Sequence, residues 1–441
     1  KEDKIFTFDI MSSLPDDSKK KKKEEKVKGG KEEKNAKSNG KKVFHFEYDI
    51  NTGKLTDVTD KEQKKEYPRW ANVSPDGKFA IYTKNYNIWY MDMENLKKAT
   101  EEEKDSTIVE YKITSDGIKD FSYGSGAWDK EGKADTTKRS YCGAAWSPDS
   151  KHFALTRINQ SNIKDLWVIN VLAQPRPKLE TYKYLMPGEP GGKSYLYLFD
   201  FSTKKSTIIK TKAFKDQSLS IETAPSTNKD AYTDYYSTKW LGDNGKFYFT
   251  RQSRDLKRLD ICSVEVGSDT CKVIISEKLN TYVESRDFKL INNGKEIIQW
   301  SERDGWAHLY LYDSNGTLKN RITSGQFHVA RIAGIDEAKR TVYFTANGKE
   351  EGINPYYSNL YSATLDGGNL KCLTPKNFDN KVNMSDDAKY FVTNYSRVDT
   401  APKSDLFDNT GRKIKEMETT DLSSLFAMGY KFPETFTVKA G

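Results

Sequence analysis

The chain has 441 residues, of which 36% are apolar and 12% aromatic, enough to build a large buried core. No stretch approaches the roughly 18 consecutive apolar residues that a transmembrane helix requires, so we expect no membrane span. The formal charge of +8 would indicate a polyanionic partner if it were spread over a folded surface.

The positive charge is concentrated in one segment instead. Residues 19–42 contain 12 lysines and 4 glutamates, and the difference, 12 − 4 = +8, equals the net charge of the whole chain. A nucleic-acid-binding surface interleaves its cations with aromatic residues for stacking, and none precedes Phe44 here. We therefore expect no nucleic-acid partner and a flexible, solvated loop over residues 18–42, with contact to a polyanion or a membrane surface as the alternative.

A repeated unit dominates the rest of the chain. Each unit has a turn of Asp, Asn, Gly or Pro, a strand of alternating aromatic and small residues, a second turn, and a further strand. Six clear units span residues 74–93, 147–171, 242–266, 291–313, 336–366 and 385–411. Their spacing of 45 to 95 residues, with almost no helical periodicity, predicts an all-β fold, a β-propeller of four-stranded blades.

Two additional hairpins, at residues 43–59 and 195–209, raise the expected number of blades to eight, with seven as the alternative. Residues 6–14 are expected to form the strand that closes the propeller, because an open ring would expose unpaired strand edges. We therefore assign residues 1–437 to the propeller and residues 438–441 to the start of a linker.

Catalytic and cofactor motifs are absent from the sequence. It has no G-x-S-x-G elbow, no P-loop, no G-x-G-x-x-G at a strand-to-helix junction and no H-E-x-x-H. The four histidines lie in or beside predicted strands, where we expect structural roles. We therefore predict no catalytic residue, no metal and no cofactor in this chain.

Cys262 and Cys271 flank a predicted turn at residues 267–269, so a hairpin would bring their side chains together. One interpretation is a disulfide, which implies an oxidising compartment such as a periplasm or a cell surface. The alternative is two reduced thiols in a cytosolic protein. Four cysteines are too few for a disulfide scaffold and wrongly spaced for zinc.

The segment WSERDGWAHLYLYD, residues 300–313, predicts a hairpin with its turn at Asp304-Gly305. Its expected role is blade stability, although Arg303 is also a candidate for ligand contact. Together with FTANGKEEGINPYYSNLYSATLDGG (344–368) and RPKLETYKYLMPGE (176–189), it resembles the propeller domain of dipeptidyl peptidase IV-like enzymes of the prolyl oligopeptidase class. The similarity extends from about Val43 to the C-terminus.

The resemblance implies a peptide substrate and an α/β-hydrolase domain of the same protein that supplies the serine, aspartate and histidine. The terminal run KFPETFTVKAG resembles the strand that leads into that domain. The cysteine hairpin also matches a region where family members can carry a propeller disulfide.

Dipeptidyl peptidases of this family hold the substrate's free amino terminus with a glutamate pair after a D-W-x-Y run. The corresponding residues here read DFSYGSG, 120–126, in which Tyr123 is retained. Gly124 and Ser125 stand where the glutamates would be. An ammonium group taken from water needs a nearby anion, so this departure removes the expected anchor.

Three acidic residues follow closely, Asp129, Glu131 and Asp135, and are candidate substitutes for the glutamates; a solvated loop is the alternative. Arg286 is a candidate for the arginine that contacts the substrate carbonyl, and a surface ion pair is its alternative role.

We therefore expect a substrate-gating propeller of a periplasmic or secreted serine exopeptidase that acts on short peptides and is inactive without its hydrolase domain. A second copy of the chain, in a homodimer, is a further partner that we consider. A freestanding propeller that serves as a protein- or ligand-binding scaffold, as in TolB-like proteins, is the alternative function.

Overall fold

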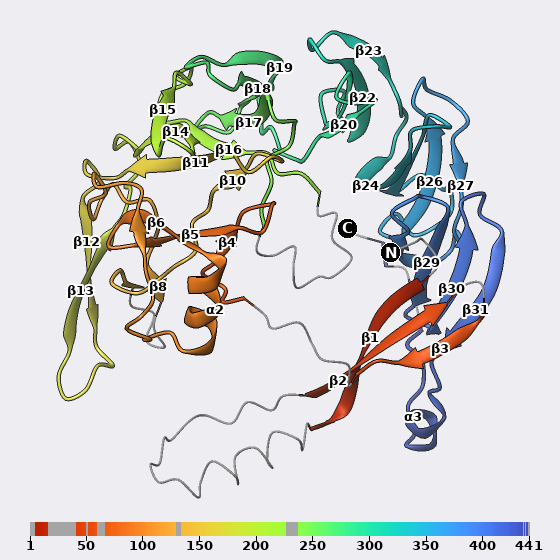
Figure 1. The fold of residues 1–441 in the computed structure, drawn as a ribbon. Coiled ribbons are helices and arrows are strands. Elements are labelled where there is room, and N and C mark those ends of the chain that lie inside the picture. The colour runs from red at the N-terminus through yellow and green to blue at the C-terminus, as the bar shows by residue number, and fades with distance from the viewer. Residues whose placement is uncertain are drawn as a thin grey trace, which may run out of the picture. The chain divides into compact units, whose positions relative to one another are not determined.

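The computed structural model describes residues 5–15, 41–49, 52–59, 67–128, 134–225, 237–434, 436, 438 and 439. Its contacts divide the chain into two compact units, Lys1–Tyr67 and Pro68–Gly441, and each is described by itself (Figure 1). The Lys-rich residues 18–40 lie outside the described part, so the prediction of a flexible loop there stays a prediction.

The first unit is one antiparallel sheet of three strands, in the order β1 (Ile5–Pro15), β2 (Lys41–Asp49) and β3 (Lys54–Asp57). Strands β2 and β3 confirm the hairpin predicted at residues 43–59. Gly53 at the hairpin turn has a φ of +66° and donates its N–H to the carbonyl of Asp49 (2.8 Å). Strand β1 contains the predicted closing strand and pairs with β2; its role in closing a ring stays a prediction.

The second unit contains six four-stranded antiparallel sheets among its described residues, each formed by strands that follow the chain from one side of the sheet to the other. The sheets are β4 (Asn72–Val73), β5 (Phe79–Lys84), β6 (Asn87–Asp92), β7 (Tyr111–Lys112); β10 (Ala145–Trp146), β11 (His152–Asn159), β14 (Lys193–Asp200), β15 (Lys205–Ile209); β16 (Ser218–Ile221), β17 (Lys246–Gln252), β18 (Arg258–Glu265), β19 (Lys272–Lys278); β20 (Lys289–Ile291), β21 (Glu296–Ser301), β22 (His308–Asp313), β23 (Leu318–Arg321); β24 (His328–Asp336), β25 (Thr341–Asn347), β26 (Ser358–Thr364), β27 (Lys371–Cys372); and β28 (Asp379–Met384), β29 (Tyr390–Arg397), β30 (Thr400–Asp408), β31 (Lys413–Thr419). This repeated blade is the unit of a β-propeller, so the predicted fold class is confirmed.

One predicted strand pairing is wrong. We expected residues 147–171 to form one blade unit, but the second half of that stretch, β12 (Asp165–Asn170), pairs with β13 (Lys178–Lys183) in a separate two-stranded sheet. Strand β11 pairs instead with β14, within the hairpin that we had counted as an additional blade. With these two merged, the second unit has six four-stranded sheets among its described residues, and the predicted number of blades stays a prediction.

The remaining described elements are short. Strands β8 (Ala127–Trp128) and β9 (Ala134–Asp135) pair with each other, and the helices are α2 (Met93–Glu101) and α3 (Ser423–Ala427). Neither helix is long and apolar enough to span a membrane.

Serine-aspartate turns precede several of the second strands. In SPDGK, the Ser74 hydroxyl donates to the Asp76 carboxylate (2.6 Å) and accepts the N–H of Phe79 (3.1 Å), which closes the turn. The same serine-to-aspartate bond recurs at Ser147 and at Ser385 (2.7 Å in both). These acidic residues therefore serve turn formation, as we predicted for them.

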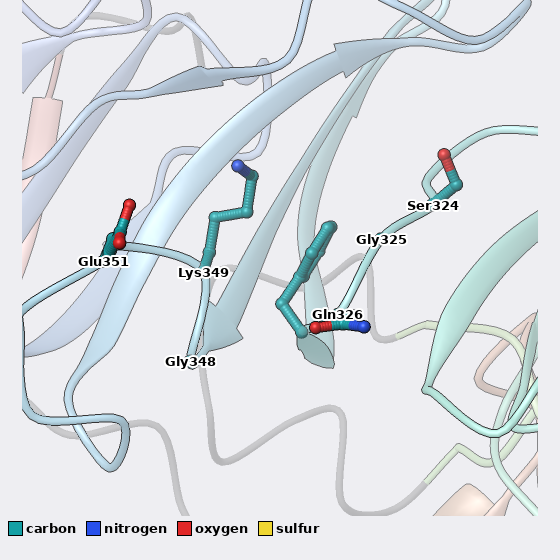
Figure 2. Close-up of a pocket in the computed structure, with 7 residues that line it drawn as sticks. Ser324, Gly325, Gln326, Gly348, Lys349 and Glu351 are labelled. Carbon is teal, nitrogen blue, oxygen red and sulfur yellow. The ribbon is translucent and has the colours of Figure 1, made fainter.

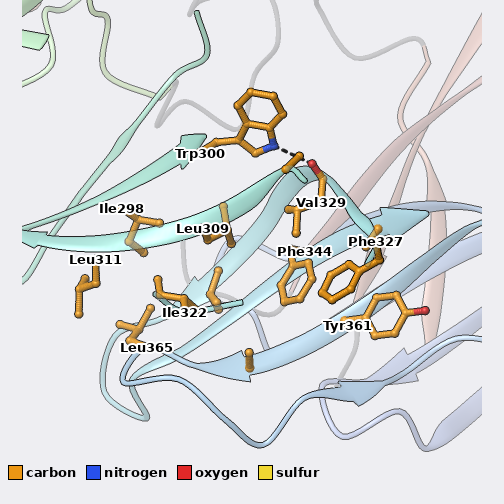
Figure 3. Packing of buried hydrophobic residues seen from close by; sticks show 14 of the residues in the cluster. Ile298, Trp300, Leu309, Leu311, Ile322, Phe327, Val329, Phe344, Tyr361 and Leu365 are labelled. Atoms are coloured by element: carbon orange, nitrogen blue, oxygen red, sulfur yellow. Dashed lines mark hydrogen bonds between the residues drawn. The ribbon is translucent and has the colours of Figure 1, made fainter. Parts of the chain in front are cut away.

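Apolar side chains fill the space between successive sheets of the second unit. In the largest cluster, Ile298 and Leu309 from one sheet pack with Phe344 and Tyr361 from the next (Figure 3). The Trp300 indole N–H donates to the carbonyl of Val329 (2.6 Å) and ties the two sheets together. Each blade thus buries its faces against its neighbours, as the repeat pattern predicted.

Candidate functional site

The candidate site residues that the structure describes lie at one end of the blades. In a blade of four antiparallel strands, the first strand begins and the fourth strand ends at the same end of the blade. The connection from the second to the third strand therefore lies at the same end as the connection to the next blade. We call this the loop edge; it comprises residues 113–126, 160–164, 279–288, 302–307, 322–327 and 348–357. Tyr123, Gly124, Ser125, Arg286 and Arg303 all belong to it.

Tyr123 is buried, and its hydroxyl donates to the two carboxylate oxygens of Asp116 (3.0 and 3.3 Å). Its ring packs against Tyr197 and Phe199 in the core beneath the loop. Burial raises the pKa of the Tyr123 hydroxyl, which therefore stays protonated. The residue that the sequence singled out thus anchors the loop to the blade.

Arg157 is the main contact that sequence reasoning missed. It comes from β11, is 1% exposed, and its guanidinium carbon lies 3.4 Å from the ring centroid of Phe121 and 4.0 Å from that of Tyr123. It donates to the carboxylate of Asp116 (2.6 Å) and to the carbonyls of Asp116 (3.1 Å) and Phe121 (2.5 Å). Burial opposes ionisation of Asp116, but the hydrogen bonds from Arg157 and Tyr123 lower its pKa overall.

A signal for Arg157 was present in the sequence. In HFALTRIN, the alternation of β11 puts Arg157 on the same face as the buried Phe153 and Leu155. A charge at an inward-facing position requires a partner, because an unpaired buried charge is very costly. The pattern could therefore have identified a buried arginine, although it could not have identified Asp116 as its partner.

Gly124 lies against Thr83 of β5. A β-carbon built at Gly124 would lie 2.2 Å from Thr83 Oγ1 and 2.8 Å from Thr83 Cβ, closer than real contacts allow. Thr83 is itself fixed, since its hydroxyl shares a hydrogen bond with that of Ser140 (2.8 Å). A glutamate at position 124 therefore does not fit this backbone, whereas the neighbouring Ser125 is exposed and carries a β-carbon without conflict.

Of the acidic residues near this loop, two are not described by the structure and two have partners. Asp129 and Glu131 lie outside the described residues. Asp135 accepts hydrogen bonds from the backbone N–H (3.0 Å) and the hydroxyl (2.6 Å) of Thr137. Asp120 lies 3.6 Å from the ammonium group of Lys183 in β13. Asp135 and Asp120 thus already have partners, and a role for Asp129 or Glu131 stays a prediction.

Arg286 lies within the loop edge between β19 and β20. Its Nε donates to Glu284 (2.8 Å), and Nη1 donates to the carbonyl of Ala330 (2.6 Å). The guanidinium carbon also lies 4.4 Å from the ring centroid of Trp300. This geometry corresponds to the ion-pair alternative that we gave for Arg286, and its contact with a substrate carbonyl stays a prediction.

Arg303 is half-buried in a polar network between two blades. It donates to Gln299 (2.8 Å), to the Ser301 hydroxyl (3.0 Å) and to the Tyr312 hydroxyl, and lies 3.4 Å from the carboxylate of Glu277. Gln299 also donates to the buried Glu277 (3.0 Å). These contacts hold two blades together, which agrees with the blade-stability role expected for this segment.

The structure places Cys271 against Cys262, within the apolar cluster that packs around β17 and β18, and both are free thiols. The hydrogen bond from the Cys262 thiol lowers the pKa of Cys271, so Cys271 is the more easily ionised of the two. The predicted hairpin is therefore confirmed, whereas the predicted disulfide between the two residues stays a prediction.

Comparison with known proteins agrees with this architecture. Residues 25–402 match the model of the "Dipeptidyl peptidase IV (DPP IV) N-terminal region", so the chain belongs to this family of β-propeller domains. Dipeptidyl peptidase 4 of Arthroderma otae is 22% identical over 412 residues, covering 88% of this chain and 47% of that protein. "Inactive dipeptidyl peptidase 10" of Mus musculus is 21% identical over 380 residues, covering 81% of this chain and 42% of that protein.

Solved structures show the same fold. The dipeptidyl peptidase 4 of Porphyromonas gingivalis superposes with a TM-score of 0.60 at 20% identity, covering 90% of this chain and 51% of that one. A putative dipeptidyl aminopeptidase IV of Bacteroides ovatus gives a TM-score of 0.56 at 17% identity, covering 85% and 50%. The chain thus spans about half the length of the relatives that it matches.

Proposed function

We propose that this chain is the substrate-binding propeller of a longer serine peptidase that acts on short peptides. The observation that carries the proposal is the family match over residues 25–402, in relatives of about twice the matched length. Because the sequence has no nucleophile elbow, the serine, aspartate and histidine would come from an α/β-hydrolase domain of the same protein. The propeller would admit only short or unfolded peptides and thereby exclude folded substrates.

The test compares the chain alone with the chain joined to its hydrolase domain. Proline- and alanine-containing dipeptide chromogenic substrates should be hydrolysed by the longer protein only. Turnover by the chain alone would refute the proposal. A longer protein without peptidase activity would favour a scaffold or an inactive peptidase. The mouse relative is named as an inactive dipeptidyl peptidase.

We infer a location outside the cytoplasm from the two adjacent thiols. A disulfide between Cys262 and Cys271 would enclose the turn that joins β18 to β19. It would leave the pairing of these two strands intact. Mild oxidation of the purified chain should therefore remove two thiols, and Cys271→Ser should retain the Cys262 thiol. Thiol counting with a maleimide reagent, followed by peptide mass mapping, checks the pairing; a linkage to another cysteine would contradict it.

We also infer that the β12–β13 hairpin, which we call the arm, mediates a homodimer. Trp167, Ile169 and Leu179 share one face of the arm and are 73%, 65% and 59% exposed, so three large apolar side chains face solvent together. A two-stranded hairpin is marginally stable by itself, and an exposed apolar patch of this kind marks an interface.

Charge on the arm favours a second copy as its partner. The tip carries the cations Arg176 and Lys178, for which the described residues provide no ion-pair partner. At the base, the Lys183 ammonium group lies near the carboxylates of Asp120 (3.6 Å) and Asp165 (3.5 Å), and Lys164 lies near Glu189 (3.5 Å), so these ion pairs join three carboxylates to two ammonium groups. An antiparallel two-fold pairing would place each tip against the other base, as closed symmetry allows.

We therefore expect the double variant Trp167→Glu, Ile169→Glu to weaken dimerisation at least 30-fold, since buried aromatic anchors contribute about 2 kcal/mol or more each. Sedimentation velocity over a concentration series measures this effect. Leu318→Glu, at a residue on β23 that is 48% exposed, is the matched control and should leave the dimer intact. A weak dimer has a dissociation constant on the order of 100 μM. A wild-type chain that stays monomeric at about that concentration would contradict the inference.

A further inference from the structure

A pocket lies within the loop edge, between two consecutive blades. It is formed by residues 324–327, which lead from β23 to β24, and by residues 348–351, which follow β25 (Figure 2). Its volume is about 480 Å³, which is within the range of sites that hold small ligands. Gly348, Lys349 and Glu351 belong to the segment 344–368 that carries the family resemblance, but none of the candidate site residues named from the sequence lines this pocket.

A buried histidine fixes one wall of the pocket. His308 Nδ1 lies 3.1 Å from the Thr323 hydroxyl, and Nε2 lies 2.9 Å from the carbonyl of Gly325. The Gly325 carbonyl can only accept, so Nε2 carries the proton and donates to it; Nδ1 of the neutral ring then accepts from the Thr323 hydroxyl, which itself accepts the N–H of Leu309 (3.1 Å). Burial lowers the pKa of His308, which agrees with this neutral form. The wall is therefore preorganised.

The floor and the facing wall supply an aromatic ring and a cation. Phe327 is 1% exposed and packs edge-on against His308, with 5.1 Å between the ring centroids. Lys349 lies on the opposite loop, and its ammonium group is 5.8 Å from the centre of the Phe327 ring. Ser324 and Gln326 line the pocket from the segment that His308 holds.

Lys349 makes no direct ion pair among the described residues, while Glu351 also lines the pocket and the charge of Lys349 acts on the neighbouring Glu350. Glu350 itself pairs with Lys376 (2.7 Å) and accepts a hydrogen bond from the Tyr361 hydroxyl (3.2 Å). The pocket thus offers an ammonium group, hydrogen-bonding side chains and an aromatic floor, which is the chemistry that a carboxylate beside an apolar group requires.

We propose that this pocket binds the carboxylate-bearing end of a short peptide. Lys349 is the counter-ion, Ser324 and Gln326 donate hydrogen bonds to the carboxylate, and the buried Phe327 ring supports the floor beneath them. Glu351, which also lines the pocket, disfavours ligands with a second carboxylate. The inference rests on the proposed function as a peptide-binding propeller, and it adds a specificity for the free carboxyl terminus.

The test measures binding of the tripeptide Ala-Pro-Ala and of its C-terminal amide to the full chain by isothermal titration calorimetry. The free acid should bind at least tenfold more tightly than the amide, and Lys349→Met should abolish that difference. Lys295→Met is the matched control, because Lys295 is an exposed lysine in a turn at the opposite edge of the neighbouring blade. Gln326→Ala should weaken binding of the free-acid peptide and leave binding of the amide unchanged.

Equal affinity for the two peptides, or a Lys349→Met variant that still prefers the free acid, would overturn the proposal. Thermal melting of each variant verifies that it is folded. The peptidase assay described above separates the two hypotheses: hydrolysis by the longer protein with equal binding of acid and amide refutes only the pocket. Preference for the acid without any peptidase activity refutes only the proposed function.

Discussion

Replacing Arg157 with leucine should lower the free energy of unfolding by about 3–5 kcal/mol. Leucine leaves the part-buried carbonyls of Asp116 and Phe121 without their donor and opens a cavity between two aromatic rings at the position of the buried Arg157 side chain. The ion pair itself adds little to this value, because the Asp116 side chain is 60% exposed and water screens it. Urea denaturation followed by tryptophan fluorescence measures the change.

The matched control for Arg157 is Arg254→Leu. Arg254 also pairs with an aspartate, Asp216 (2.9 Å), but its side chain is 37% exposed, so we expect a loss below about 1 kcal/mol. Arg157→Leu should further increase amide hydrogen exchange over residues 116–124, because that loop loses its attachment to β11. Equal losses of stability in the two variants would contradict the role that we assign to Arg157.

The fold was largely predictable because each blade repeats a local pattern. Turns such as SPDGK and strands such as FAIYTK are readable from neighbouring residues, and the structure confirms them. Pairing between strands was less accessible: β12 and β14 both follow β11 and both alternate, so sequence pattern alone did not show that β14 is the partner. The arm is recognisable only once its strands are seen to pair with each other.

The family resemblance selected Tyr123 and Arg286, and the hairpin pattern placed Arg303 beside a turn; the structure puts all three residues on loops at one end of the blades. Their role as a site stays a prediction, and their contacts could not be predicted. Their partners come from distant segments: Arg157 contacts Asp116 across 41 residues, and the pocket of Lys349 joins two blades. Such contacts depend on how the blades pack, which no local pattern encodes.

Packing around Gly124 limits where a glutamate can be introduced to hold the amino terminus of a peptide. If glutamate is introduced at position 124, its β-carbon must displace Thr83 or move the loop, and we expect a loss of about 2–3 kcal/mol in the free energy of unfolding. Glutamate at the exposed position 125 should change stability by less than about 0.5 kcal/mol. Thermal and urea denaturation of the two variants measure this difference.

The same two variants test whether the loop faces the amino terminus of a bound peptide. Ser125→Glu supplies an anion beside Tyr123 without disturbing Thr83, so it should tighten binding of a peptide with a free amino terminus relative to its N-acetylated form by about tenfold. Gly124→Glu should give no such preference, because the loop that would carry the new carboxylate is displaced. If Ser125→Glu leaves the two peptides equally bound, the exposed side of this loop does not contact the amino end of the ligand.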